Sequence, residues 1–346
     1  MVTSQQVAQL AGVSRATVSR VLNGSPRISE EARQRVLAAV AALGYEPDTA
    51  AQSLVRQKSR MIALGLPGQD PSPSFFTSLG KTAHYFYIDV LAHIEQETFA
   101  AGYDLIIPSH ARSKIAEGYI RGLQTRRIAG ALMLSISPED SRIEGLLQSN
   151  IPTVFVDTAG MGERAIHIRS NHQDGSRQLV EHLLALGHRR IAFVIGQLVD
   201  MAAAERFLGC QQALANAGIP LDPALVCQTG WNTDEAYQGA LDLLDRRRDF
   251  TAIVAGSDLM ALGVMRALYE RNLRVPDDIS LAGADDVVLS QFAIPPLTTI
   301  RQDRQLIAQE AVQRLLALIE GREVSSFIAP TQLVIRNSTG PVPERE

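Results

Sequence analysis

The sequence predicts a small all-α helix-turn-helix head followed by an α/β core of two lobes. The first 60 residues are basic and contain three short amphipathic helical patterns. From residue 61 onward, short apolar runs alternate with longer amphipathic stretches. The chain has 346 residues, which is too long for one ordinary hydrophobic core. Continuous apolar strands that alternate with helices are typical of parallel sheets covered on both faces.

Residues 4–24, SQQVAQLAGVSRATVSRVLNG, have the pattern of a helix-turn-helix. We expect Ser4 to cap the first helix, Gly12 to form the turn and Ser14 to cap the second helix. The residues expected to face inward are Val7, Leu10 and Ala11 in the first helix and Val18, Val21 and Leu22 in the second.

The outward residues of the second helix suit contact with double-stranded DNA. They are Arg15, Ala16, Thr17, Ser19 and Arg20. In a helix-turn-helix the second helix reaches base edges in the major groove, where Arg can bind guanine and Ser or Thr can bind phosphates. We expect further DNA contacts from Ser4, Ser14 and Asn23. The alternative interpretation is an ordinary helical hairpin with a polar, solvated face.

A third helix is expected between Ser29 and Gly44. Ser29 is a favourable cap, and Glu30 and Glu31 suit the positive N-terminal end of a helix. The apolar stripe of this helix comprises Val36, Leu37, Val40 and Leu43. Three helices of this size form one small domain with little core of its own.

The charge is distributed unevenly along the chain. The net charge is −4, but residues 1–60 carry eight Arg and Lys residues against four acidic ones, which gives +4 there and −8 in the remainder. A basic head on an acidic body suits a DNA-binding module joined to a domain of another function.

The overall composition predicts a soluble, cytoplasmic protein. No apolar run approaches the length of a membrane span, and the N-terminus is polar rather than a signal peptide. Cys210 and Cys227 form neither a disulfide framework nor a metal-binding spacing, so we expect no metal and no cofactor.

Residues 47–60 are expected to link the head (residues 1–46) to the core (residues 61–346). Pro47 ends the third helix, and the Ala-rich segment TAAQSLVR can form a short helix with one prominent apolar residue, Leu54. Such a segment buries little by itself, so it should be ordered only by a partner.

Seven strands and seven helices are expected in the core. The strands are expected within residues 61–67, 104–108, 128–134, 153–157, 190–196, 251–256 and 279–284. The helices are expected at about 88–101, 114–126, 172–187, 203–217, 233–246, 257–272 and 303–321. Because ligands of such folds bind beyond the carboxyl ends of the strands, the polar residues that follow the strands are candidates for a site.

These candidates have the chemistry of sugar binding. They are Asp157, Ser257 and Asp285 after strands, Arg206 in the helix after residues 190–196, and Trp231 in the polar segment TGWNTDE. The face of an indole ring can stack on a pyranose, and carboxylate and guanidinium groups can bind its hydroxyls. For each residue there is an alternative, because an Asp after a strand often caps a helix and a lone Trp often lies in the core.

Several segments resemble the LacI/GalR family of bacterial transcription regulators. The matching segments are VAQLAGVSRATVSRVLNG, ISEEARQRVLAAVAALGYEP and AAQSL in the head and linker, and HQDGSRQLVEHLLALGHRRIAFVIG, ERFLGCQQALANAGI, SDLMALGVMRALYERNLRVPDDISLAGADD and IPPLTTIRQD in the core. The resemblance covers nearly the whole chain and keeps the order of the motifs.

The resemblance implies a DNA-binding head, a hinge helix and a two-lobed core similar to periplasmic sugar-binding proteins. It places Arg15, Ala16 and Arg20 at base-reading positions and Leu54 at the hinge position that wedges into the minor groove. The effector positions it implies are Asp157, Arg206, Trp231, Ser257 and Asp285. The lobes would comprise residues 61–158 with 302–322, and residues 159–301 with 323–340.

Some positions depart from the family pattern. These are Asp48 and Gln52 in the linker, and Ala202, Ser257 and Ala284 in the core. Residues 68–85 are an insertion relative to most members, so pocket residues cannot be transferred to this segment. The ligand site is therefore expected to be wider or differently polar than in relatives.

The favoured function is a repressor, not an enzyme, that binds a near-palindromic operator as a homodimer and responds to a sugar bound between the lobes. One alternative is a sugar-binding protein without a regulatory role, which the basic head and the absence of a signal peptide oppose. The other is a sugar-active enzyme that uses Asp285 and Asp157 as acid and base, although the sequence does not establish the spacing of glycosidase carboxylates.

Overall fold

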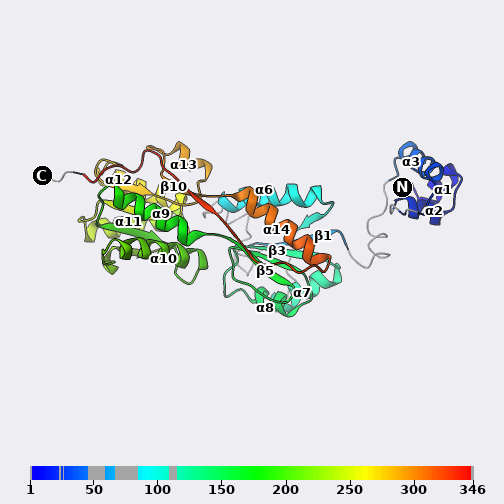
Figure 1. The fold of residues 1–346 in the computed structure, drawn as a ribbon, viewed down its shortest axis with the longest axis horizontal. Coiled ribbons are helices and arrows are strands. Elements are labelled where there is room, and N and C mark those ends of the chain that lie inside the picture. Colours follow the sequence, from blue (N-terminus) through cyan, green and yellow to red (C-terminus); the bar gives the residue numbers. More distant parts are fainter. Residues whose placement is uncertain are drawn as a thin grey trace. The chain divides into compact units, whose positions relative to one another are not determined.

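The computed structural model describes residues 2–22, 25, 27–45, 59–66, 85–108 and 115–343 (Figure 1). Two compact units are present, Met1–Ser59 and Arg60–Glu346. The expectations for Asn23, for Leu54 and most of the linker, and for nearly all of the inserted segment 68–85 lie outside the described residues.

The head consists of three helices, α1 (Ser4–Ala11), α2 (Arg15–Leu22) and α3 (Glu30–Leu43). Val7, Val18 and Val36 are fully buried where the three helices meet. Ser29 caps α3 by accepting from the backbone N–H of Ala32, and Gly44 ends it with a left-handed backbone (φ 59°), as predicted.

Two details of the head differ from the prediction. Thr3, not Ser4, caps α1, because Thr3 and Gln6 form a reciprocal capping box one residue earlier. Leu10 and Leu37 were expected to face inward but are 57% and 50% exposed. The buried faces of α1 and α3 contain the small residues Ala8 and Ala39 instead.

The first lobe of the core is built on a parallel six-stranded sheet in the order β11-β5-β4-β3-β1-β2. The strands are β1 (Met61–Gly65), β2 (Asp104–Ile106), β3 (Gly130–Leu134), β4 (Thr153–Val156), β5 (Ala165–Ser170) and β11 (Phe327–Ala329). Helices α6 (Tyr85–Ala100) and α14 (Arg304–Ile319) lie side by side on one face, and α7 (Ile115–Thr125) and α8 (Ser141–Gln148) cover the other (Figure 1).

The second lobe is built on a parallel four-stranded sheet in the order β7-β6-β8-β9. The strands are β6 (Ile191–Ile195), β7 (Val226–Gln228), β8 (Ala252–Ala255) and β9 (Ser280–Ala282). Helices α9 (His172–Ala185) and α10 (Met201–Asn216) pack on one face, and α11 (Thr233–Arg246) and α12 (Asp258–Glu270) pack on the other. A 3-10 turn, η1 (Pro223–Leu225), and a short helix, α13 (Val288–Phe292), complete the lobe.

Three chain segments connect the lobes. They run from β5 into α9, from β10 (Thr299–Gln302) into α14, and from β11 into β12 (Thr331–Val334), which pairs antiparallel with β10. The sequence analysis ended the first lobe at residue 158 and assigned residues 159–301 and 323–340 to the second lobe. In the structure β5 and β11, which fall in those ranges, belong to the sheet of the first lobe. The first lobe therefore extends to Ser170 and includes residues 327–329.

The seven predicted strands and seven predicted helices are present with shifts of a few residues at their ends. The elements that the prediction missed are short or of mixed polarity, such as the three-residue edge strands β7 and β11 and the alternating segment AIHIRS of β5. None of the helices in the described part of the chain has the length and hydropathy needed to cross a membrane.

Candidate functional site

The outward face of α2 presents the predicted DNA-contacting residues to solvent. The exposed residues are Ser14, Arg15, Ala16, Ser19 and Arg20. Ser14 caps the helix by accepting from the backbone N–H of Thr17 at 3.1 Å, and the two hydroxyls lie 2.9 Å apart. Thr17, which was also predicted to contact DNA, is half-buried. Ser4, also half-buried, lies in the first turn of α1.

Strained backbone marks the carboxyl ends of three core strands. Ser135 follows β3 with φ 45°, Asp157 follows β4 with φ 53°, and Asp285 and Asp286 follow β9 with φ 113° and 50°. Left-handed backbone is unfavourable for residues with a Cβ atom, and such residues cluster at binding and catalytic sites. Two of these strand ends, those of β4 and β9, are among the ones that the sequence selected, whereas the end of β3 is not.

A buried ion pair joins α10 to the loop after β9. Arg206 Nη2 donates to Asp285 Oδ1 at 2.7 Å, and both side chains are close to nine-tenths buried. Arg206 also donates to the carbonyl of Gly256, and Gln302 Nε2 donates to the same Asp285 oxygen at 2.7 Å. This carboxylate thus holds together residues from three separate segments of the chain.

Asp157 connects the first lobe to this ion pair through His172. The Tyr87 hydroxyl donates to Asp157 Oδ2 at 3.0 Å, and His172 Nε2 lies 3.3 Å from Asp157 Oδ1. Arg206 Nε donates to His172 Nδ1 at 3.4 Å. Because guanidinium can only donate, Nδ1 accepts and Nε2 carries the proton that is given to Asp157.

We refer to these six residues as the interlobe cluster. They are Tyr87, Asp157, His172, Arg206, Asp285 and Gln302. Asp157 follows a strand of the first lobe, whereas His172 begins α9 of the second lobe. The bond between them therefore crosses from one lobe to the other.

The two carboxylates of the cluster experience different electrostatic environments. Burial raises the pKa of Asp285, and Arg206 only partly offsets this effect. Burial also acts to raise the pKa of Asp157, but hydrogen bonds from His172 and Tyr87 outweigh it and the pKa is lowered. Burial and the nearby Asp157 raise the pKa of Tyr87 well above its ordinary value, so Tyr87 remains a hydrogen-bond donor.

Trp231 lies beside the cluster. The guanidinium carbon of Arg206 is 5.5 Å from the centre of its ring, within the range of a cation–π contact. Ser257 is buried and caps α12, its Oγ accepting from the backbone N–H of Met260 at 3.2 Å. This bond uses the oxygen as an acceptor, so the hydroxyl can still donate.

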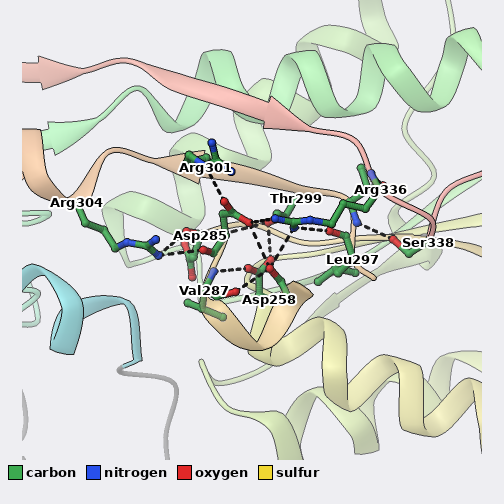
Figure 2. A network of polar contacts seen from close by, with 12 residues as sticks. Asp258, Asp285, Val287, Leu297, Thr299, Arg301, Arg304, Arg336 and Ser338 are labelled. Carbon is green, nitrogen blue, oxygen red and sulfur yellow. Dashed lines mark hydrogen bonds and ion pairs between the residues drawn. The ribbon is translucent and has the colours of Figure 1, made fainter. Parts of the chain in front are cut away.

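A second network of acidic residues and arginines adjoins Asp285 at the connection between the lobes (Figure 2). Asp286 is paired with Arg301 at 2.6 Å and with Arg336 at 2.5 Å. Arg304, at the start of α14, donates to the backbone carbonyl of Asp286 at 3.0 Å. These contacts attach the loop after β9 to β10, α14 and the C-terminal segment.

The structure brings Asp157, Arg206, Asp285 and Trp231 together, and it adds residues that the sequence did not single out. Tyr87 lies in α6, His172 is the first residue of α9 and Gln302 is the last residue of β10. Gln302 is 2% exposed, and its Oε1 has no hydrogen-bond partner among the described residues. The sequence signal that could have identified it is its place in the segment IPPLTTIRQD, one of those that resemble the family.

Two family models match the chain. Residues 3–48 match bacterial regulatory proteins of the lacI family, and residues 180–339 match a periplasmic binding protein-like domain. The HTH-type transcriptional regulator CelR of Thermobifida fusca is 32% identical over 344 residues, covering 97% of this chain and 98% of the relative. The lactose operon repressor of Escherichia coli (strain K12) is 33% identical over 342 residues, covering 98% and 91%.

Solved structures show the same similarity. The lac repressor dimer bound to operator and the anti-inducer ONPF has a TM-score of 0.82 and 33% identity, covering 98% of this chain and 99% of that chain. The CelR–cellobiose complex has a TM-score of 0.73 and 29% identity, covering 98% and 100%.

Proposed function

The chain belongs to the LacI family of bacterial regulatory proteins, and we propose that a sugar bound at its interlobe cluster controls its affinity for operator DNA. It is a helix-turn-helix transcriptional regulator with a periplasmic-binding-protein-like core. The observation that carries the proposal about the sugar is the hydrogen-bonded connection of both lobes through Asp157, His172, Arg206 and Asp285.

On DNA, the protein acts as a homodimer on a near-palindromic operator. The similar lac repressor is a dimer on its operator, and two-fold symmetric proteins match two-fold symmetric sites. The bases are read by Arg15, Ala16 and Arg20. The phosphate backbone of the DNA is contacted by Ser4, Ser14, Thr17, Ser19 and Asn23. Leu54 inserts into the minor groove at the operator centre.

The interlobe cluster suits a hydroxyl-rich ligand. Its carboxylates and the Gln302 amide oxygen accept hydrogen bonds, whereas Arg206 and Tyr87 donate them, and Trp231 and Ser257 lie close by. A sugar offers donors and acceptors of both kinds and an apolar face for an indole ring. Similar structures include CelR in complex with cellobiose and the lac repressor bound to ONPG.

Ligand binding can be transmitted because the cluster spans two lobes. Sugar hydroxyls that replace the bond between His172 and Asp157 change the contacts that hold the lobes together. Only a ligand with different affinities for two lobe arrangements can shift the balance between them. This difference in affinity for the sugar is the upper limit of the change in operator affinity.

The alternative functions are less well supported. In an enzyme Asp157 and Asp285 would act as base and acid, but Asp157 is held by Tyr87 and His172 and Asp285 by Arg206, so we propose no catalytic role. A binding protein without a regulatory role would not need the exposed arginines of α2. Operator binding places the protein in the cytoplasm.

A sugar panel tests the proposed ligand class. Neutral mono- and disaccharides, sugar phosphates and uronates are added to the full chain, and the unfolding temperature and Trp231 emission are recorded. A sugar that binds only the folded state should raise the free energy of unfolding by about 2.7 kcal/mol when its free concentration is 100 times its Kd. If no saccharide shifts either signal while purines or amino acids do, the sugar assignment is wrong.

A further inference from the structure

The indole of Trp231 is fixed by the loop between β6 and α10. Its Nε1–H donates to Asp200 Oδ2 at 2.8 Å, and Arg206, six residues further along the chain, lies over the ring. Trp231 itself belongs to the loop between β7 and α11. The segment after β6, from Asp200 at the end of the loop to Arg206 in α10, therefore contacts a side chain of the loop after β7.

Asp200 occupies the position that normally caps α10 but does not cap it. Its backbone is extended, with φ −77° and ψ 129°, yet its side chain makes no hydrogen bond to the first turn of the helix. Four other Asp or Asn residues at this position do cap their helices: Asp140, Asn171, Asn232 and Asp303. The carboxylate of Asp200 is directed to the indole instead of the helix.

Gly196, the first residue after β6, provides the space that the indole occupies. A Cβ atom at this position would lie 2.5 Å from Cε2 and 2.6 Å from Cζ2 of Trp231. The backbone of Gly196 is not among the left-handed glycines, so the absence of a side chain matters for space rather than for conformation. Here the close approach of the indole ring explains why position 196 has no side chain.

We propose that Asp200 and Gly196 are positioning residues that fix Trp231 as the wall of the ligand site. Asp200 acts through the indole N–H, and Gly196 acts by leaving room for the ring. The inference rests on the proposed role of Trp231 in sugar binding. A rigid aromatic wall loses little conformational freedom when a ligand stacks on it, so its position sets affinity for the ring it contacts.

Three substitutions at Asp200 separate positioning from helix capping. Serine is a good cap but is too short to reach the indole, asparagine can still accept the N–H bond, and alanine can do neither. Trp231 is the only tryptophan, so its near-ultraviolet circular dichroism and its quenching by acrylamide report on this side chain without any sugar. We expect Asp200→Ser and Asp200→Ala to mobilise the ring, and Asp200→Asn to keep it ordered.

The same variants are then titrated with cellobiose while bound to operator. Asp200→Ser and Asp200→Ala should raise the concentration for half-maximal release by roughly three- to tenfold, the change expected for one lost hydrogen bond. If Asp200→Ser behaves as the parent and only Asp200→Ala differs, Asp200 acts as a helix cap and the proposal is overturned.

Gly196→Ala provides an independent test. The added methyl should displace the indole and produce the spectral change of Asp200→Ala, whereas in a Trp231→Phe background, which lacks the clashing ring atoms, it should have little further effect on stability. Unchanged Trp231 spectra in Gly196→Ala would overturn the proposal. Because the spectra are recorded without sugar, they decide the positioning roles even if cellobiose does not release DNA.

Discussion

At the scale of single residues, the protein combines an exposed basic surface on the head with a buried polar cluster in the core. Arg15 and Arg20 are exposed on α2, where charge can reach base edges and phosphates. Arg206 and Asp285 are nearly buried and satisfy each other. Removal of one partner leaves an uncompensated buried charge, so a substitution at either residue alters the local structure as well as the proposed ligand contacts.

Arg20→Ala tests base reading by the head. If Arg20 binds a guanine, the variant should weaken operator binding by about 1–3 kcal/mol and reduce discrimination against random DNA. The measurement is competition of labelled operator with random duplex at fixed salt. Equal losses on both DNAs would identify Arg20 as a phosphate contact instead.

Asp285→Asn tests the ligand site. The amide cannot pair with Arg206 as a carboxylate does, so a bound hydroxyl loses charged partners and ligand affinity should fall by about 1–3 kcal/mol. Operator binding without ligand should be retained, giving a regulator that ignores its signal. The matched control is Asp277→Asn, an exposed aspartate of the same lobe. A parent-like response in Asp285→Asn would show that the wrong residue was selected.

Asp286 gives a pH-dependent prediction. Burial acts to raise its pKa, but hydrogen bonds from Arg336 and Arg301 outweigh this effect and the pKa lies below its ordinary value. Such a carboxylate stabilises the fold above its unfolded-state pKa of about 3.9, and this contribution is lost as pH falls through the lower folded-state pKa.

Asp286→Asn should therefore destabilise the core by about 1.5–3 kcal/mol at pH 6, because hydrogen bonds to charged groups are lost. The difference in free energy of unfolding between parent and variant should decrease as pH falls below 4. Urea unfolding at several pH values measures this difference. A difference that stays constant down to pH 2.5 would contradict the role assigned to the ion pairs.

At the scale of elements, strand ends and helix starts position the functional groups. The sequence identified Asp157 and Asp285 because continuous apolar strands precede them, and parallel strands present their carboxyl ends at one edge. It could not identify Tyr87 and His172, because these residues fall within ordinary amphipathic helical patterns. Their role depends on which helices face the strand ends, which is a property of tertiary packing.

The sequence alone also does not determine which residue caps α1. Ser4 and Thr3 are both acceptable caps in the sequence, and only the reciprocal bonds between Thr3 and Gln6 decide between them. We expect Thr3→Ala to reduce the stability of the head by about 1 kcal/mol and Ser4→Ala to change it little. Thermal unfolding of the two variants followed by circular dichroism compares them. A larger loss in Ser4→Ala would place the cap one residue later.

At the scale of the whole molecule, the division into head and two-lobed core was predictable because charge and hydrophobic periodicity change near residue 60. The division between lobes was predicted less well. β5 and β11 were not predicted as strands, and the first sheet recruits both although their sequences lie far apart. Non-local pairing of this kind leaves little trace in a single sequence.

The most direct test of the account is operator binding measured with and without ligand in one experiment. Fluorescence anisotropy of labelled operator is followed while the saccharide identified by the panel is added to the parent and to Arg206→Ala. We expect the operator affinity of the parent to change at least fivefold, the lower range of allosteric coupling, and Arg206→Ala to bind operator without responding to the saccharide. A parent whose operator affinity is the same with and without a sugar that binds it would contradict the account.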